Sequence, residues 1–207
     1  NNGNGEFNDV TNNRAYVFKD LGMVTDASWK DIDGDGKQDL IVTQNWGSPK
    51  IFRNNGKQLV HLKTNLDSLN GWWNTLEVAD INKDGLPDLI LGNKGLNIPY
   101  KPSKEKPLKI YVNDFDNNGT IEQIVTETID GKDVPVVTKH ELTAQIVSLK
   151  KQNLKFSDYA SKSIQELFSE DILSKSIVRE VNTTSSIVAL NTKDGQFKII
   201  ILPNQVQ

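Results

Sequence analysis

Three short stretches of this chain share one pattern of acidic and amide residues. They read DIDGDGKQD at residues 31–39, DINKDGLPD at residues 80–88 and DFDNNGTIE at residues 114–122. Each stretch has an acidic residue at position 1, Asp or Asn at positions 3 and 5, Gly at position 6, and an acidic residue at position 9. Calcium takes six to eight oxygen ligands, which a tightly turned loop supplies from alternate side chains. The pattern therefore predicts three calcium-binding loops.

Each loop offers four side-chain ligands and, at position 7, one main-chain carbonyl. The predicted ligands of the first loop are Asp31, Asp33, Asp35, Lys37 (carbonyl) and Asp39. Those of the second are Asp80, Asn82, Asp84, Leu86 (carbonyl) and Asp88. Those of the third are Asp114, Asp116, Asn118, Thr120 (carbonyl) and Glu122. Because only the first loop has four carboxylates, we expect it to bind calcium most tightly. The Gly at position 6 suits a sharp reversal with positive φ.

Helical calcium loops open with the same pattern, so the flanking residues have to distinguish them. An EF-hand needs a bidentate Glu at position 12 and a helix on each side. Position 12 is here Val42, Leu91 and Val125, and short apolar runs follow each loop. Such runs predict buried strands. A metal-free polar turn is the alternative for any single loop, but crowded carboxylates repel one another without a cation, and three copies favour calcium.

The composition limits the classes of protein that fit. The 207 residues carry a net charge of −3, which gives no basic face for nucleic acid. The absence of cysteine excludes disulfides, thiolate metal sites and cysteine nucleophiles. No apolar run approaches the roughly 20 residues of a membrane span. The chain opens on NNGNGEF without an initiator Met, so we expect a piece of a larger protein.

The segments around the first two loops align as repeats. Trp29 and Val78 each stand two residues before a loop, and LIVTQNWG after the first loop corresponds to LILGNKGLN after the second. The loops begin 49 residues apart, at Asp31 and Asp80, which suits a unit of four short strands. Residues 49–62 complete the first unit as a hairpin that turns at Asn54, Asn55 and Gly56.

These features resemble the FG-GAP or VCBS-type repeat, the blade of integrin-α-like β-propellers, over roughly residues 1–125. GWWN at residues 71–74, GNKGLN at residues 92–97 and the ending SSIVAL…GQFKIIILP are similar to large VCBS-repeat surface proteins of Bacteroidetes, akin to the ASPIC/UnbV and cartilage-acidic-protein group. The resemblance implies up to three Ca²⁺ ions in the loops. It also implies a noncatalytic scaffold for contacts outside the cell or on a bacterial outer membrane.

We therefore predict an all-β fold, a partial β-propeller of two to three blades of four-stranded antiparallel sheet with a small helical insertion. The predicted segments are closing strands of a preceding blade at 1–20, a first blade at 21–70, a second, expanded blade with two calcium loops at 71–138, a helical insertion at 139–170, and returning strands of a further blade at 171–207. Within the insertion, apolar spacing predicts helices at His140–Gln152 and Ser157–Phe168, the second capped by Ser157.

So few blades leave open edges, because closed propellers need about four to eight blades. We expect the rest of the parent propeller, or another protein chain, to cover these edges. Trp29 is expected to pack between blades. Trp46, Trp72 and Trp73 lie near loops, where aromatic faces stack on sugars or on a partner, and one of the adjacent pair Trp72 and Trp73 is the better candidate for exposure.

Exposed aromatics make a carbohydrate-binding or adhesion module the alternative function. A glycan-active enzyme is a weaker alternative, in which two carboxyl groups would flank the scissile bond. Carboxylates that hold calcium are ionised and are not available as general acids. The two histidines, His61 and His140, lie in no recognisable nucleophile motif. The sequence therefore predicts a protein that is not an enzyme.

Overall fold

The computed structural model describes residues 2–152, 156–160 and 162–207. The chain forms two compact units, which are described separately. Unit 1 comprises Asn1–Pro99 and Thr184–Gln207, and unit 2 comprises Tyr100–Thr183. Unit 2 is thus inserted into the sequence of unit 1. Three antiparallel sheets contain the strands, and the described part of the chain is mostly β and propeller-like without a closed barrel.

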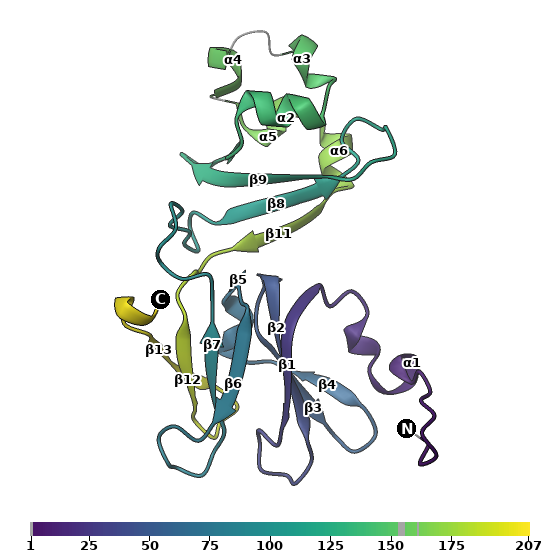
Figure 1. Cartoon of the computed structure of the whole chain (residues 1–207), viewed down its shortest axis with the longest axis vertical. Coiled ribbons are helices and arrows are strands. Elements are labelled where there is room, and N and C mark those ends of the chain that lie inside the picture. Colours follow the sequence, from purple (N-terminus) through teal and green to yellow (C-terminus); the bar gives the residue numbers. More distant parts are fainter. Residues whose placement is uncertain (1, 153–155, 161) are drawn as a thin grey trace. The chain divides into compact units, whose positions relative to one another are not determined.

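The first sheet of unit 1, which we call blade A, has the strand order β1-β2-β3-β4 (Figure 1). The short strand β5 also pairs with β2. The bounds are β1 Met23–Lys30, β2 Asp39–Gly47, β3 Lys50–Asn54, β4 Leu59–Leu62 and β5 Gly71–Trp72. The first loop joins β1 to β2, and the hairpin predicted at residues 49–62 is β3 and β4.

The second sheet of unit 1, blade B, has the strand order β6-β7-β12-β13. The bounds are β6 Thr75–Ala79, β7 Asp88–Gly92, β12 Ile187–Asn191 and β13 Phe197–Ile201. The second loop joins β6 to β7. Blades A and B therefore share one plan, in which the strand before the loop lies at the sheet edge. The whole of unit 2 lies in the chain between the second and third strands of blade B.

The core of unit 1 follows from side-chain alternation along β2. Successive residues of a strand face opposite sides of the sheet. Ile41 belongs to the main hydrophobic cluster of unit 1, to which blade B contributes Leu89 and Leu91. Leu40 and Val42 point to the other face, where a smaller cluster includes Phe18. The unbroken apolar run after the first loop thus reflects a strand that is buried on both faces.

The short helices of unit 1 lie outside the blades. They are α1 Thr11–Arg14, η1 Tyr16–Phe18, η2 Asn65–Ser68 and η3 Asn204–Val206. The prediction of closing strands at residues 1–20 is wrong, because the described residues 2–20 contain α1 and η1 and no strand. The Asp9 carboxylate accepts a hydrogen bond from the Thr11 amide at 2.8 Å, a side-chain contact that favours a helical turn over an extended chain.

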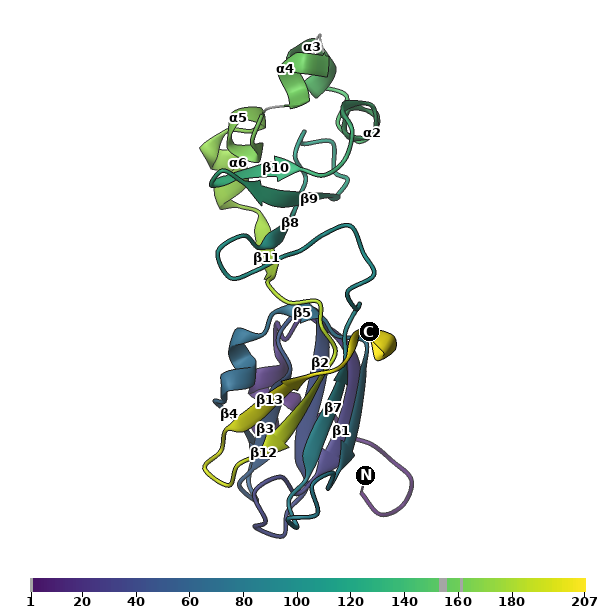
Figure 2. The ribbon, with the colours of Figure 1, turned by 90° about the vertical axis from the view of Figure 1, so that its left-hand side faces the viewer.

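Unit 2 is a sheet with helices on one face. Its strand order is β10-β9-β8-β11, and the third loop joins β8 to β9. The strand bounds are β8 Leu108–Asn113, β9 Glu122–Ile129, β10 Lys132–Pro135 and β11 Ile177–Val181. The helices are α2 Lys139–Gln145, α3 Leu149–Gln152, α4 Phe156–Ala160, α5 Ile164–Leu167 and α6 Glu170–Ser174. Figure 2 shows them gathered beside this sheet, where Leu142, Ile146 and Ile164 pack on Tyr111 and Ile124.

The strand pairing corrects two predicted segments. Residues 71–138 do not form one expanded blade, because β8, β9 and β10 belong to the separate sheet of unit 2. Residues 171–207 do not form a further blade, because β11 completes the sheet of unit 2 while β12 and β13 complete blade B. The pairing of β12 with β7 joins residues about a hundred positions apart, such as Ile187 with Leu91, which no local pattern encodes.

The predicted insertion at residues 139–170 is helical, but its helices are shorter than expected. Residues 153–155 and 161 of this segment lie outside the described residues. Ser157 does not cap a helix, because α4 begins before it at Phe156. Instead, Thr138 caps α2 and Ser163 caps α5, each in a capping box with a Glu three residues later. That reciprocal pair satisfies two otherwise unbonded amides.

The tryptophans divide between the core and the surface of unit 1. Trp73 is completely buried, and its indole N–H donates to the Leu69 carbonyl at 2.9 Å. The half-buried rings of Trp46 and Trp72 meet edge to face, with their centres 5.2 Å apart. Trp29 is 55% exposed, so the expectation that it packs between blades is wrong. Trp29 is paired with Leu40 of the neighbouring strand β2, and residues paired across two strands lie on the same face of the sheet. This face points away from the core that blade A shares with blade B.

Candidate metal centres

All three acidic loops connect antiparallel strands, as predicted, and not helices. The first two connect the edge strand of a blade to its neighbour, and they lie at the same end of unit 1 (Figure 1). The third connects two inner strands of unit 2. An EF-hand arrangement is therefore excluded for these loops.

The position-1 carboxylate organises each loop in the same way. It accepts hydrogen bonds from the main-chain amides of positions 5 and 6. The distances are 3.1 and 2.8 Å to Asp31 in the first loop, 3.1 and 3.0 Å to Asp80 in the second, and 3.0 and 2.8 Å to Asp114 in the third. The side chain at position 5 also accepts from the position-7 amide at 2.7–2.9 Å. The three loops are thus one structural motif and not merely three similar strings.

Two backbone positions in each loop lie in the left-handed region. The glycines at position 6 have φ of +84°, +87° and +85° for Gly36, Gly85 and Gly119, as predicted. Position 4 is left-handed as well, and there only the first loop has glycine, Gly34, whereas Lys83 and Asn117 take φ of 62° and 56°. Residues other than glycine adopt this region at an energetic cost, so the fold imposes the turn on the second and third loops.

The position-9 carboxylate ties each loop back on itself. It accepts from the position-2 amide, with distances of 3.0 Å for Asp39, 2.9 Å for Asp88 and 3.0 Å for Glu122. In the blades, its second oxygen accepts from the end of the third strand: Asp39 from the Asn54 amide at 2.7 Å and Asp88 from the Asn191 amide at 2.9 Å. The position-9 residue therefore joins loop and sheet.

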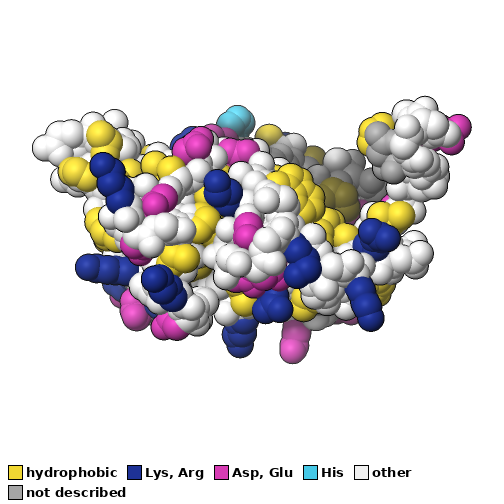
Figure 3. Space-filling view, turned by 90° about the horizontal axis from the view of Figure 1, so that it is seen from below, with side chains coloured by type: hydrophobic (Ala, Val, Ile, Leu, Met, Phe, Trp, Pro, Cys, Tyr) yellow, Lys and Arg dark blue, Asp and Glu magenta, His cyan; other side chains and the backbone are white. Residues whose placement is uncertain are grey.

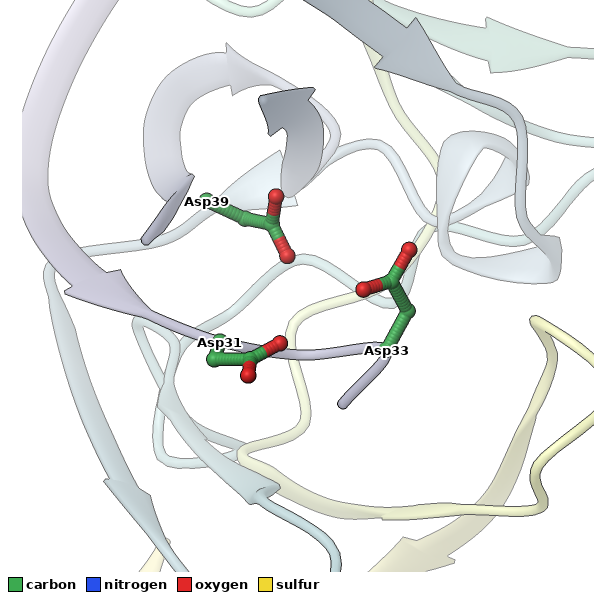
Figure 4. A group of neighbouring side chains, drawn as sticks. All are labelled: Asp31, Asp33 and Asp39. Atoms are coloured by element: carbon green, nitrogen blue, oxygen red, sulfur yellow. The ribbon is translucent and has the colours of Figure 1, made fainter. Parts of the chain in front are cut away.

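Carboxylates converge in the first loop. Asp31, Asp33 and Asp39 have one oxygen each within 4.8 Å of the others. Figure 4 shows these three side chains directed toward one another from the two ends of the loop. Burial raises the pKa of Asp39, with the nearby charge of Asp33 adding to that effect, while the amides of Asn54 and Ile32 oppose it. A cation bound among these oxygens would favour their ionised forms.

The fourth predicted carboxylate of the first loop is engaged elsewhere. Asp35 accepts a hydrogen bond from the Lys37 ammonium at 2.8 Å, and this bond lowers the pKa of Asp35. The Arg53 guanidinium lies 3.3 Å from Asp33. Both contacts partly neutralise the negative charge of this loop. They therefore oppose the higher calcium affinity that was expected from its fourth carboxylate.

The third loop contains a second convergent group, Asp114, Asp116 and Glu122, again within 4.8 Å of one another. One oxygen of Asp116 is buried, and no hydrogen bond reaches it from the described residues. An unpartnered buried oxygen is costly, and calcium is a ligand that would satisfy it. The oxygen-only donor set therefore fits a hard divalent cation.

The second loop differs because position 3 is an amide. Asn82 donates to Asp84 at 3.0 Å and accepts from the Asp84 amide at 3.0 Å. In the described part of the chain, the close three-carboxylate groups are those of the other two loops. The carbonyl ligands predicted at Lys37, Leu86 and Thr120 stay predictions, since the contacts described for these residues involve their amides and, for Lys37, the ammonium group as well.

Sequence reasoning missed two residues of the sites, Asn54 and Asn191. They occupy equivalent places at the ends of the third strands β3 and β12, where each amide bonds a position-9 carboxylate. Both asparagines end a short apolar strand sequence, IFRN at residues 51–54 and IVALN at residues 187–191. This similarity can be recognised only once β12 is known to be the third strand of blade B.

Figure 3 shows Lys and Arg side chains interspersed with Asp and Glu side chains on the face drawn there. Among the described helices, none has the length and apolar character needed to cross a bilayer.

In a comparison with known protein families, residues 31–91 match the family model described as an FG-GAP-like repeat. No curated protein matches the chain. The matched segment begins at the first residue of the first loop and ends in β7 of blade B. It therefore covers the strands β2, β3, β4 and β5 of blade A, both blade loops, and β6 and most of β7 of blade B. The chain accordingly carries an FG-GAP-like repeat at residues 31–91, within a partial propeller-like fold.

Proposed function

We propose that this chain is a calcium-stabilised propeller segment of a larger extracellular or cell-surface protein, and that it acts as a noncatalytic scaffold for protein contacts. The observation that carries the proposal is that three loops between strands share one pattern of hydrogen bonds. Two of these loops each bring oxygens of three carboxylates within 4.8 Å of one another. The residues that would hold the ions are the side chains at positions 1, 3, 5 and 9. The bound ion would supply positive charge and fix the loop.

Exposed apolar side chains support a role in contacts. Met23, Val24 and Trp29 on the edge strand β1 and Val60 on β4 are all exposed. They lie on blade A, whose outer strands β1 and β4 have no paired strand on one side in the described chain. Apolar edges of this kind associate readily. The partner would be a further blade of the parent protein or another protein chain.

A noncatalytic role agrees with the surroundings of the two histidines. His61 contacts Asp67 at 2.8 Å on the surface of blade A, and Asp67 also pairs with Lys50 at 3.3 Å. These contacts form a polar network that links β3, β4 and η2. His140 lies exposed in the first turn of α2.

Thermal unfolding with and without calcium tests the proposal. Binding to the folded state alone stabilises by about 2.7 kcal/mol when the ion is at a hundred times its Kd. For a chain of this size that corresponds to a rise in Tm of about 5–10 °C. We expect this rise when calcium chloride is added to EDTA-treated protein, and a smaller rise in the variant Asp116→Asn. Equal melting curves in EDTA and calcium would refute calcium stabilisation.

A carbohydrate-binding or adhesion role is the second candidate, and one depression of unit 1 favours it. The depression has a volume of about 510 Å³ and is lined by Trp29, Phe18 and Leu59 together with Arg14 and Lys57. An exposed indole beside cationic side chains suits stacking on an acidic sugar. Screening on a glycan array with Trp29→Ala as the control tests it: binding that the variant loses supports this role, and equal binding by both proteins argues against it.

A further inference from the structure

A continuous series of hydrogen bonds joins the first and second loops across the two blades. The Ile32 amide donates to Asp39 at 3.0 Å within the first loop. The carbonyl of the same residue accepts from the side-chain amide of Asn191 at 3.0 Å. The Asn191 main-chain amide donates to Asp88, the position-9 residue of the second loop, at 2.9 Å. Two buried residues, Ile32 and Asn191, thus connect the two position-9 carboxylates through their hydrogen bonds.

This connection is shielded from water. Ile32 is 3% exposed and Asn191 is 7% exposed, while Asp39 and Asp88 are completely buried. In a buried environment hydrogen bonds are electrostatically stronger than in water. If one carboxylate moves, water therefore cannot replace the hydrogen bonds that are lost between the two loops.

The equivalent asparagine of blade A makes no such connection. The Asn54 amide bonds Asp39 at 2.7 Å, as the Asn191 amide bonds Asp88. Both side-chain oxygens accept from the amide two residues later, at 2.9 Å for Asn54 and 3.2 Å for Asn191. The side-chain amide of Asn54, however, donates to Gln38 of its own loop at 3.1 Å. Asn54 is therefore a matched control for Asn191.

We propose that calcium binding at the first and second loops is positively coupled, and that Asn191 carries the coupling as a positioning residue. The inference rests on the proposed calcium function. An ion at the first loop fixes Asp39 and with it the main chain of Ile32. The fixed carbonyl holds Asn191, whose amide then holds Asp88 in place for the second ion. The second binding event orders less of the protein, which raises its affinity.

The test uses the full chain with the third loop weakened by Asp116→Asn. Calcium chloride is titrated into EDTA-stripped protein while the main-chain NMR signals of Gly36 and Gly85 report the first and second loops separately. We expect calcium at one loop to raise the affinity of the other about 5-fold, within the usual range of coupling between sites. Adding Asp84→Asn, which weakens the second loop, should lower the affinity of the first loop by the same factor, since coupling is reciprocal.

Two further variants locate the coupling. Asn191→Ser keeps a side-chain oxygen for the turn but has no amide that reaches Ile32, so the coupling factor should fall to about 1. Asn54→Ser makes the matching change in blade A and should leave the coupling factor unchanged. If Asn191→Ser does not fold, the side-chain NMR signal of Asn191 is followed in the Asp84→Asn protein instead, where calcium at the first loop alone should shift it.

The outcomes separate the two proposals. Failure of both loops to bind calcium would overturn the calcium function and the coupling together. Binding at both loops without coupling, coupling that survives in Asn191→Ser, or an Asn191 signal that calcium at the first loop does not move would overturn the coupling alone. Coupling that Asn191→Ser abolishes and Asn54→Ser retains supports it.

Discussion

The blade loops and the loop of unit 2 share one turn but are attached to their sheets differently. In the blades, Asp39 accepts one amide from its own loop and Asp88 accepts two, and each also accepts one amide from the third strand of the sheet. In unit 2, Glu122 accepts the amide of Phe115, and none of the described residues donates to its other oxygen. The nine-residue pattern therefore encodes the turn and the gathering of carboxylates, whereas the length over which the third strand pairs decides whether the loop is also bonded to the sheet.

The reach of the third strand explains the difference. In the blades, β3 and β12 pair with the strand after the loop up to Leu40 and Leu89, directly beside the position-9 residues. In unit 2, the third strand β10 pairs with Thr126–Ile129 of β9 and ends before it reaches Glu122. The end of the third blade strand supplies Asn54 or Asn191, and the sheet of unit 2 has no equivalent asparagine bonded to Glu122 among the described residues.

Replacing position-9 carboxylates by amides should give the largest difference. Asp39→Asn leaves one oxygen for two amide donors, so one buried N–H loses its partner. This should reduce the free energy of unfolding of unit 1 by about 2–3 kcal/mol. Glu122→Gln still offers an oxygen to Phe115 and should cost under about 1 kcal/mol. Chemical denaturation in EDTA measures both without a contribution from calcium.

The position of the tryptophans helps this measurement. All four, Trp29, Trp46, Trp72 and Trp73, lie in unit 1, so their fluorescence reports the unfolding of that unit. Hydrogen exchange of the β8 and β9 amides reports unit 2. Equal losses for Asp39→Asn and Glu122→Gln would show that the second hydrogen bond does not distinguish the blades from unit 2.

Unit 2 has a different polar anchor, which should give the next largest effect. Asp133 is buried and accepts from Lys109 at 2.9 Å, Tyr111 at 2.8 Å and Gln165 of α5 at 3.3 Å. Burial acts to raise the pKa of Asp133, but the hydrogen bonds from Lys109 and Tyr111 outweigh it and leave the pKa below its ordinary value. Asp133→Asn should destabilise unit 2 by about 2 kcal/mol at neutral pH.

The sign of this pKa shift fixes the pH dependence. A carboxylate with a lowered folded pKa contributes stability above its unfolded pKa and loses that contribution as the pH falls through the folded value. The difference between wild type and Asp133→Asn should therefore be full at pH 7 and shrink below about pH 4. Hydrogen exchange of unit 2 at several pH values measures it; a difference that grows in acid would contradict the assignment.

The left-handed positions should give the smallest effects and should be alike in all three loops. A Cβ at Gly36, Gly85 or Gly119 would have no atom within 4 Å, so alanine there costs conformational energy only. Each substitution should destabilise by about 1–2 kcal/mol. Lys83→Gly and Asn117→Gly remove the same cost at position 4 and should stabilise by a fraction of that amount, about 0.5 kcal/mol. Thermal unfolding checks the opposite signs, and stabilisation by alanine would contradict the shared turn.

Local pattern was enough to predict the loops and most strands. Strands β11, β12 and β13 all fall within residues 171–207, where returning strands were predicted. Capping boxes were also readable, since Thr138 and Ser163 each precede a Glu by three residues. Ser157 has no such partner, because residue 160 is Ala, which explains why that cap was misplaced.

Long-range pairing was not predictable from the sequence. Nothing near Ile187 indicates that its strand joins β7 across the whole of unit 2. The exposure of Trp29 likewise depends on what covers the outer face of blade A, and not on the strand that carries it. The joining of Asp88 to Asn191 follows from the same pairing, so the link between the two blade loops was invisible until the strands were placed.

Calcium stoichiometry tests the central claim most directly. Protein stripped with EDTA and dialysed against calcium is examined by native mass spectrometry and isothermal titration calorimetry, with magnesium in parallel. The loops predict up to three bound calcium ions, and one fewer in Asp116→Asn, whose unpartnered buried oxygen is part of the third site. Protein that retains no calcium and gives no binding heat would contradict the claim that these loops are metal centres.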